Sequence, residues 1–247
     1  MKKILLVLFF LICIRSVSQT NEPIQADRPD QTETPAIVPK GMVQVETGFT
    51  FQKNDAYSKT NTLPSILWKY GVNANFELRL ITEFVSDIND TVTISGITPV
   101  LIGCKIKLCE EKGIVPKASF IGHISLPNMA STKFKADAMA PEFRFVFQHT
   151  LSEKCSLSYN LGSEWDGVSA EPTFIYTLTT GYAITNKLGS YIELFGFSPQ
   201  NDKANHNFDC GLTYLINTNF MLDLSSGIGI TDNAPDHYFA FGFSFRI

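Results

Sequence analysis

Apolar and polar residues alternate along almost the whole chain from Met42 to the C-terminus. A period of two predicts β-strands whose two faces meet different surroundings. Each stretch is about as long as a tilted strand that crosses a bilayer. The alternation predicts twelve strands, at residues 43–52, 65–70, 76–84, 100–108, 118–126, 143–151, 155–165, 174–184, 188–197, 208–216, 220–230 and 239–247.

The connections between these stretches are short and long in turn. Short polar turns are expected at residues 73–75, 110–113, 152–154, 186–187 and 217–219, and longer loops at 54–60, 86–95, 127–137, 166–171, 198–206 and 231–236. Short periplasmic turns and longer extracellular loops are typical of outer-membrane barrels. An even number of strands then places both chain ends on the periplasmic side. The pattern therefore predicts an all-β, transmembrane, antiparallel up-and-down β-barrel.

Aromatic residues gather at the ends of the apolar face. Tyr70, Tyr182 and Tyr214 each lie just before a short turn, where a periplasmic aromatic girdle would need them. Trp68 and Phe76 extend this belt, and the opposite belt would contain Phe51, Phe84, Trp165 and Phe174. The alternative is a soluble β-sandwich or lipocalin-like barrel, because soluble sheets also alternate. The polar face, rich in Gly, Ser and Thr, and the aromatic belts favour the membrane barrel.

The N-terminus has the features of an export signal. Two lysines precede an apolar run from Ile4 to Ile14, and a polar stretch follows. This predicts a signal peptide at residues 1–18, cleaved after Ser18. A lipoprotein cut at Cys13 is the alternative, but Leu11 and Ile12 before it are bulky. We therefore expect export to the outer membrane of a Gram-negative cell, with membrane lipid and the barrel assembly machinery as partners.

Net charge and cysteine spacing argue against nucleic-acid binding and against a cysteine metal site. The chain has 20 Lys and Arg against 24 Asp and Glu, and three of the basic residues lie in the signal. A moderately acidic protein is not expected to bind nucleic acid. The four later cysteines show no metal-type spacing, and we expect no cofactor. They are Cys104, Cys109, Cys155 and Cys210.

Catalytic and metal-binding interpretations have weaker support. His123 and Ser125 share a face that would point inward, and no Gly-x-Ser-x-Gly sequence is present, so no catalytic residue is expected. Polar residues in the last two long loops could converge on a metal, but loop residues are more often simply solvated. These residues are Asp202, His206, Asp232, Asp236 and His237.

If the apolar face meets lipid, the polar face lines the lumen. One wall is then charged with both signs, and the opposite wall carries mostly small residues. The charged side chains could select a solute or simply brace the barrel. Apolar residues also fall on the inward face: Ile81, Val146, Ile175, Tyr191 and Phe195. The candidate lumen contacts are Glu77, Arg79, Glu83, Lys105, Lys107, His123, Glu142 and Arg144.

Residues 19–41, which precede the barrel at 42–247, form a Pro-rich, charged stretch without periodicity. This stretch is either a periplasmic tail or a lumen plug. Its charged residues could pair with the charged wall, which gives the hypothesis that residues 27–35 enter the lumen; the alternative is a mobile leader. The plug candidates are Asp27, Arg28, Asp30 and Glu33.

Three short sequences resemble a known family of outer-membrane transporters. They are Asp27-Arg28-Pro29-Asp30-Gln31-Thr32-Glu33-Thr34-Pro35, Leu161-Gly162-Ser163-Glu164-Trp165-Asp166-Gly167 and Asp232-Asn233-Ala234-Pro235-Asp236. The family is named for the meta-pathway of phenol degradation, and the likeness runs from about Ala26 to the end. It implies an outer-membrane barrel with a transport role and supplies no catalytic or binding residues. The chain departs from barrel practice by ending in Ile247 rather than an aromatic residue.

Together, pattern and resemblance predict a porin-like channel. We expect passive passage of small solutes, with small organic or aromatic compounds suggested by the resemblance. The alternative is a plugged, non-conducting barrel with a structural or surface-recognition role.

Overall fold

The computed structural model describes residues 22–90 and 92–247. The predicted signal peptide and the Cys13 alternative lie outside the described residues. Among these residues, no helix is long and apolar enough to cross a bilayer. Two short 3-10 helices, η1 (Pro127–Met129) and η2 (Thr132–Phe134), lie in the loop at residues 127–140.

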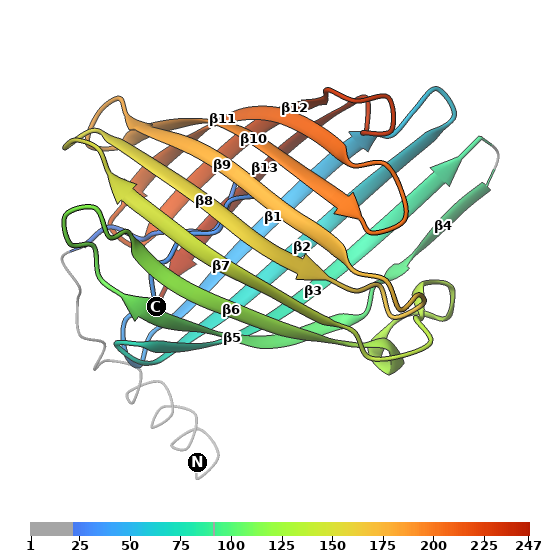
Figure 1. Ribbon diagram of the computed structural model, residues 1–247, viewed down its shortest axis with the longest axis horizontal. Coiled ribbons are helices and arrows are strands. Elements are labelled where there is room, and N and C mark those ends of the chain that lie inside the picture. The colour runs from blue at the N-terminus through green and yellow to red at the C-terminus, as the bar shows by residue number, and fades with distance from the viewer. Residues whose placement is uncertain (1–21, 91) are drawn as a thin grey trace, which may run out of the picture.

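The described residues form one antiparallel sheet that closes on itself (Figure 1). β1 pairs with both β2 and β13, and β3 pairs with both β2 and β5. Twelve strands therefore complete the barrel, as the alternation predicts, and β4 is additional. The strands are β1 (Val43–Lys53), β2 (Ser58–Asn73), β3 (Phe76–Asn89), β4 (Val92–Ile97), β5 (Val100–Cys109), β6 (Lys117–Leu126), β7 (Pro141–Thr150), β8 (Cys155–Glu164), β9 (Thr173–Ala183), β10 (Leu188–Pro199), β11 (Asn205–Asn217), β12 (Phe220–Gly229) and β13 (His237–Arg246).

Side-chain burial follows the predicted alternation. On β10, Tyr191, Glu193 and Phe195 are buried while Ile192 and Leu194 between them are exposed. The inward positions of Val146 and Ile175 are likewise buried. Four of the five apolar residues predicted to face inward are therefore buried, and the fifth, Ile81, is half-buried. The outer surface is apolar and must be covered by lipid, because a soluble barrel would leave this whole face in water.

Both aromatic belts lie on the outer surface. Tyr70, Tyr182 and Tyr214 are exposed near the short turns, and Phe51, Phe84 and Phe174 are exposed near the opposite rim. Their rings would sit at the two membrane interfaces, where one side of an aromatic ring is apolar and the other is wet.

Two of the predicted long loops, residues 54–60 and 86–95, are wrong. β2 begins at Ser58, so the connection after β1 is short. Residues 86–95 form a hairpin instead of a loop, because β3 continues to Asn89 and pairs with β4 (right edge of Figure 1). This hairpin extends past the part of β3 that pairs with β5. Most residues of β4 are exposed or half-buried, and the hairpin lies beyond the wall where strands must separate lipid from lumen, so the alternation that marks the other strands fades there.

Proline occupies the middle of β2, where it would normally break a strand. Pairing skips Leu63 and Pro64 on both sides, towards β1 and towards β3. Proline has no N–H to give to a neighbouring strand and is tolerated at such irregularities. The strand therefore passes the proline without leaving the barrel wall.

Candidate functional site

The N-terminal segment (residues 22–41) lies inside the barrel. It starts at the rim with the short turns, where the Ile24 amide donates to the Thr218 carbonyl at 2.8 Å. It returns to the same rim, where the Gly41 amide donates to the Gly71 carbonyl at 2.7 Å. Between these points the segment forms a loop within the lumen, closed by the Thr34 amide, which donates to the Asp27 carboxylate at 3.0 Å. In Figure 1 it is the blue trace inside the left part of the barrel.

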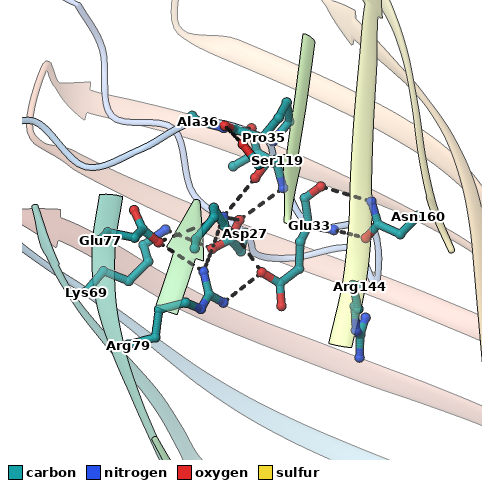
Figure 2. Close-up of polar contacts among 12 residues, drawn as sticks. Asp27, Glu33, Pro35, Ala36, Lys69, Glu77, Arg79, Ser119, Arg144 and Asn160 are labelled. Carbon is teal, nitrogen blue, oxygen red and sulfur yellow. Dashed lines mark hydrogen bonds and ion pairs between the residues drawn. The ribbon is translucent and has the colours of Figure 1, made fainter. Parts of the chain in front are cut away.

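Asp27 is the centre of a buried ion-pair network (Figure 2). Its carboxylate lies 2.9 Å from Lys69 Nζ, 2.9 Å from Arg79 Nη1 and 2.9 Å from Lys105 Nζ. We call Lys69, Arg79 and Lys105 the cationic cluster; their side chains are 1%, 0% and 0% exposed. Burial alone would raise the pKa of the Asp27 carboxyl, but these three cations hold it well below its ordinary value. Asp27 is therefore an anion at any physiological pH.

Wall carboxylates satisfy only part of the cationic cluster. Glu46 pairs with Lys69, and Glu77 lies 3.1 Å from Arg79 Nη1. Glu33 of the segment supplies another carboxylate, 2.7 Å from Arg79 Nη2 and 3.8 Å from Lys105 Nζ. The segment thus contributes two of the four carboxylates that neutralise three buried cations.

Backbone groups of the segment are also bonded to the wall. Glu46 accepts the Asp27 amide at 2.9 Å, and Glu77 accepts the Val38 amide at 2.8 Å. Asn160 accepts the Glu33 amide at 2.7 Å. Buried backbone groups must find such partners, because water does not reach them. Segment and wall are therefore complementary in hydrogen bonding as well as in charge.

We call residues 28–31 the tip of the segment. Arg28 holds this tip against the wall formed by β1, β12 and β13. Its Nη2 lies 2.9 Å from the Asp223 carboxylate, whose side chain is fully buried. The guanidinium lies on Gly48 and Gly242, which are paired across β1 and β13. A Cβ built on Gly48 would be 1.8 Å from Arg28 Nη1, and one on Gly242 would be 2.7 Å from Nε. Only glycine at both positions leaves room for this arginine.

The other side of the tip meets carboxylates. Glu193 accepts the Gln31 amide at 2.8 Å and the Thr179 hydroxyl at 2.9 Å. Asp209 accepts the Tyr191 hydroxyl at 2.9 Å. Burial, together with the charges of Glu193 and Asp209, raises the pKa of Asp30 well above its ordinary value. The tip thus contains one cation, Arg28, that pairs with the wall, and one acid, Asp30, whose surroundings disfavour its ionised form.

The remaining predicted lumen residues are spread over a wider area. Glu142 lies 2.9 Å from Arg144 Nε and 3.5 Å from His123 Nδ1. His123 also accepts a bond from Arg79 Nε at 3.0 Å, which links this group to the cationic cluster. Glu83 and Lys107 lie apart from the cluster, where they bond to Ser65 and Glu110 respectively.

Three cavities flank the segment. The largest of these three, about 910 Å³, lies on the side of the short turns and is lined by residues of β6 to β12, of two short turns and of the segment. A second, about 360 Å³, lies towards the long loops and is lined by Phe195, Phe197, Asn207 and Tyr238. A third, about 340 Å³, reaches Lys69 from the short-turn rim. The first two cavities share three lining residues, Arg28, Pro29 and Asp30, so the segment tip separates them.

Several of the residues considered for catalysis or metal binding have other partners. Ser125 Oγ accepts the Ala140 amide at 3.1 Å, while His123 is bonded to Arg79. In the loops, Tyr176 bonds to His206 and Lys53 pairs with Asp236. Across residues 22–90 and 92–247, no three His, Cys, Asp or Glu side chains are grouped as metal ligands would be.

Comparison with known proteins identifies the family and the fold. The family described as "Putative MetA-pathway of phenol degradation" matches residues 26–247. The chain belongs to this family. No curated protein sequence matches the chain.

Solved structures similar to this phenol-degradation family member are outer-membrane barrels. An outer membrane channel from Pseudomonas putida F1 has a TM-score of 0.69 at 12% identity, covering 94% of this chain and 100% of that one. The NanC porin has a TM-score of 0.54 at 10% identity, covering 82% and 98%. The translocator domain of the autotransporter NalP from Neisseria meningitidis has a TM-score of 0.50 at 8% identity, covering 85% and 90%. At these identities the likeness establishes the outer-membrane barrel fold.

Several wall residues that hold the segment of this family member are not among the sequence-based candidates. Glu46, Lys69, Glu193, Asp209 and Asp223 all bond to the segment or lie against it, yet none was proposed. Each lies on the polar phase of its strand, so the same period of two identifies them as inward-facing. What the sequence could not show is which of the inward residues the segment would meet.

Proposed function

We propose that this protein is an outer-membrane channel for small organic solutes, and that the N-terminal segment closes it in the conformation described here. One observation carries the proposal. A 910 Å³ cavity and a 360 Å³ cavity lie on opposite sides of the segment tip, and both are lined by Arg28, Pro29 and Asp30. Displacement of the tip would join two spaces that together extend towards both rims.

The volume and lining of the 360 Å³ cavity support small organic compounds as the solutes. Ligand sites usually have volumes of roughly 300–1,000 Å³ and combine apolar surface with a few polar groups. This cavity offers Phe195, Phe197 and Tyr238 beside the amides of Asn205 and Asn207. The family description, which refers to phenol degradation, is consistent with such solutes.

Single-channel conductance of the refolded mature protein in a planar bilayer tests the proposal. The mature protein with its segment intact should be silent or open only briefly. A variant of it that lacks residues 19–40 should give steady openings. Correct folding is checked beforehand by heat-modifiable migration on a gel. Because the deletion also removes the partners of buried cations, Arg28→Gln in the full-length chain serves as a milder opening variant.

Two outcomes contradict the proposal in different ways. If both folded variants are silent, the barrel does not conduct, and the structural or surface-recognition alternative replaces the channel. If the full-length protein conducts as steadily as the deletion, the segment does not close the pore.

A further inference from the structure

We infer that the cationic cluster is a binding site for small carboxylate-bearing solutes, and that Asp27 and Glu33 occupy it as a tethered internal ligand. This inference rests on the proposed channel function and names a substrate class for it. The juxtaposition that carries it is a set of three buried wall cations that each pair with a carboxylate of a segment that is not part of the wall.

The charge balance of the wall is the first argument. Lys69, Arg79 and Lys105 meet only two carboxylates of the wall, those of Glu46 and Glu77. Without the segment, the cluster would retain one unneutralised positive charge inside the barrel. A buried charge without a partner is costly, so the empty cluster would favour another anion in the place of the segment carboxylates.

The geometry of the two segment carboxylates defines the ligand. Asp27 and Glu33 bind adjacent nitrogens of one guanidinium, Arg79 Nη1 at 2.9 Å and Nη2 at 2.7 Å. Lys105 Nζ donates to Asp27 Oδ1 at 2.9 Å and lies 3.8 Å from the Glu33 carboxylate. Of these two carboxylates, Lys69 pairs only with that of Asp27. Guanidinium groups suit carboxylates because their donors match the carboxylate oxygens in geometry. A short dicarboxylate could place its two ends where the Asp27 and Glu33 carboxylates lie.

The cluster can be reached from the short-turn rim. A cavity of about 340 Å³ has Lys69 in its lining together with Lys107, Lys117 and Arg246. Glu22 and Glu110 are the carboxylates of that lining, so positive charges outnumber negative ones. Clefts lined by one sign of charge raise the local concentration of the opposite ion. Glu33 also lines the 910 Å³ cavity and Asp27 does not, so an incoming anion would reach the position of Glu33 first.

Competition within the molecule sets the expected affinities. A ligand attached by a short linker acts at an effective concentration in the millimolar range or above. Asp27 and Glu33 should therefore mask the cluster in the native protein. Neutralising both carboxylates without deleting the segment should unmask it.

Isothermal titration of the refolded, detergent-solubilised full-length protein tests this inference. Succinate is the probe, and uncharged succinamide of similar size is its control. Succinate should bind the double variant Asp27→Asn, Glu33→Gln at least tenfold more tightly than the native protein. Glu33→Gln alone, which keeps the Asp27 ion pairs, should give a smaller gain. Arg79→Gln added to the double variant should abolish the gain.

Binding is measured independently of conduction, so the two proposals fail separately. Equal succinate affinity in native protein and folded double variant would overturn the inference, as would equal binding of succinamide. A folded barrel that binds succinate but never conducts would overturn only the channel. A conducting barrel that ignores succinate in every variant would overturn only the carboxylate site.

Discussion

A methyl group at position 48 should dislodge the tip of the N-terminal segment. Gly48 and Gly242 lie beneath the Arg28 guanidinium, and a Cβ on Gly48 would be 1.8 Å from Arg28 Nη1. The obstructing atoms are the far end of a flexible side chain, so Arg28 can move while the strand pairing of β1 stays intact. In the Gly48→Ala variant Arg28 therefore has to leave Asp223.

The size of the effect follows from burial. The Asp223 side chain is fully buried and that of Arg28 is 19% exposed. Removing one partner of a buried pair costs roughly 3–5 kcal/mol, and the remaining exposure of Arg28 argues for the lower end, about 3 kcal/mol. Because about 1.4 kcal/mol is a factor of ten, seating of the segment should weaken by roughly 100-fold.

Hydrogen–deuterium exchange of peptides covering residues 24–36 measures this seating directly. The amides of Asp27, Gln31 and Glu33 donate to wall side chains, so they exchange only when the segment leaves the wall. Gly122→Ala is the matched control, because its new Cβ would lie in ordinary contact, 3.4 Å from Phe120 Cε1. Unchanged protection in Gly48→Ala would refute the reasoning. So would additive effects of Gly48→Ala and Arg28→Ala, since both should act through the same ion pair.

Three further results are expected. Leu194→Lys places a charge on the lipid face in the middle of β10 and should destabilise the barrel by roughly 2–4 kcal/mol in urea unfolding from liposomes; no loss would contradict the outward orientation of this face. Replacing residues 86–96 by a short turn should leave heat-modifiable migration unchanged, because β3 and β5 close the barrel through residues 76–81 and 101–106; loss of the folded band would show that the hairpin is needed for closure. The pKa of Asp30 is raised in the folded protein, so seating of the segment loses stability as pH rises above the ordinary aspartate range and Asp30 ionises beside Glu193 and Asp209. Amide protection of the segment, corrected for the intrinsic pH dependence of exchange, should therefore fall. Asp30→Asn should weaken this dependence, and an unchanged dependence in that variant would contradict the assignment.

The strands of the barrel were predictable because the residues of each strand alternate between those that face lipid and those that face the lumen. A residue facing lipid must be apolar and its neighbour facing the lumen need not be, so β8 to β13 alternate along nearly their whole length. The turns were predictable for the same reason, since the alternation stops where a strand leaves the bilayer. The β3–β4 hairpin was missed because its residues outside the bilayer no longer face two different media.

The sequence by itself determined the period-two pattern of an outer-membrane barrel, its antiparallel closure, and a charged segment with oppositely charged residues to meet. Only the tertiary structure decided which of these charges meet. Asp27 is separated from Lys69 and Lys105 by 42 and 78 residues, and Arg28 from Asp223 by 195. Such contacts depend on barrel closure, which pairs β1 with β13 in one register and places Gly48 opposite Gly242. The physical reason is that period two fixes the face of each residue, whereas contacts across the lumen depend on the stagger of all the strands between them.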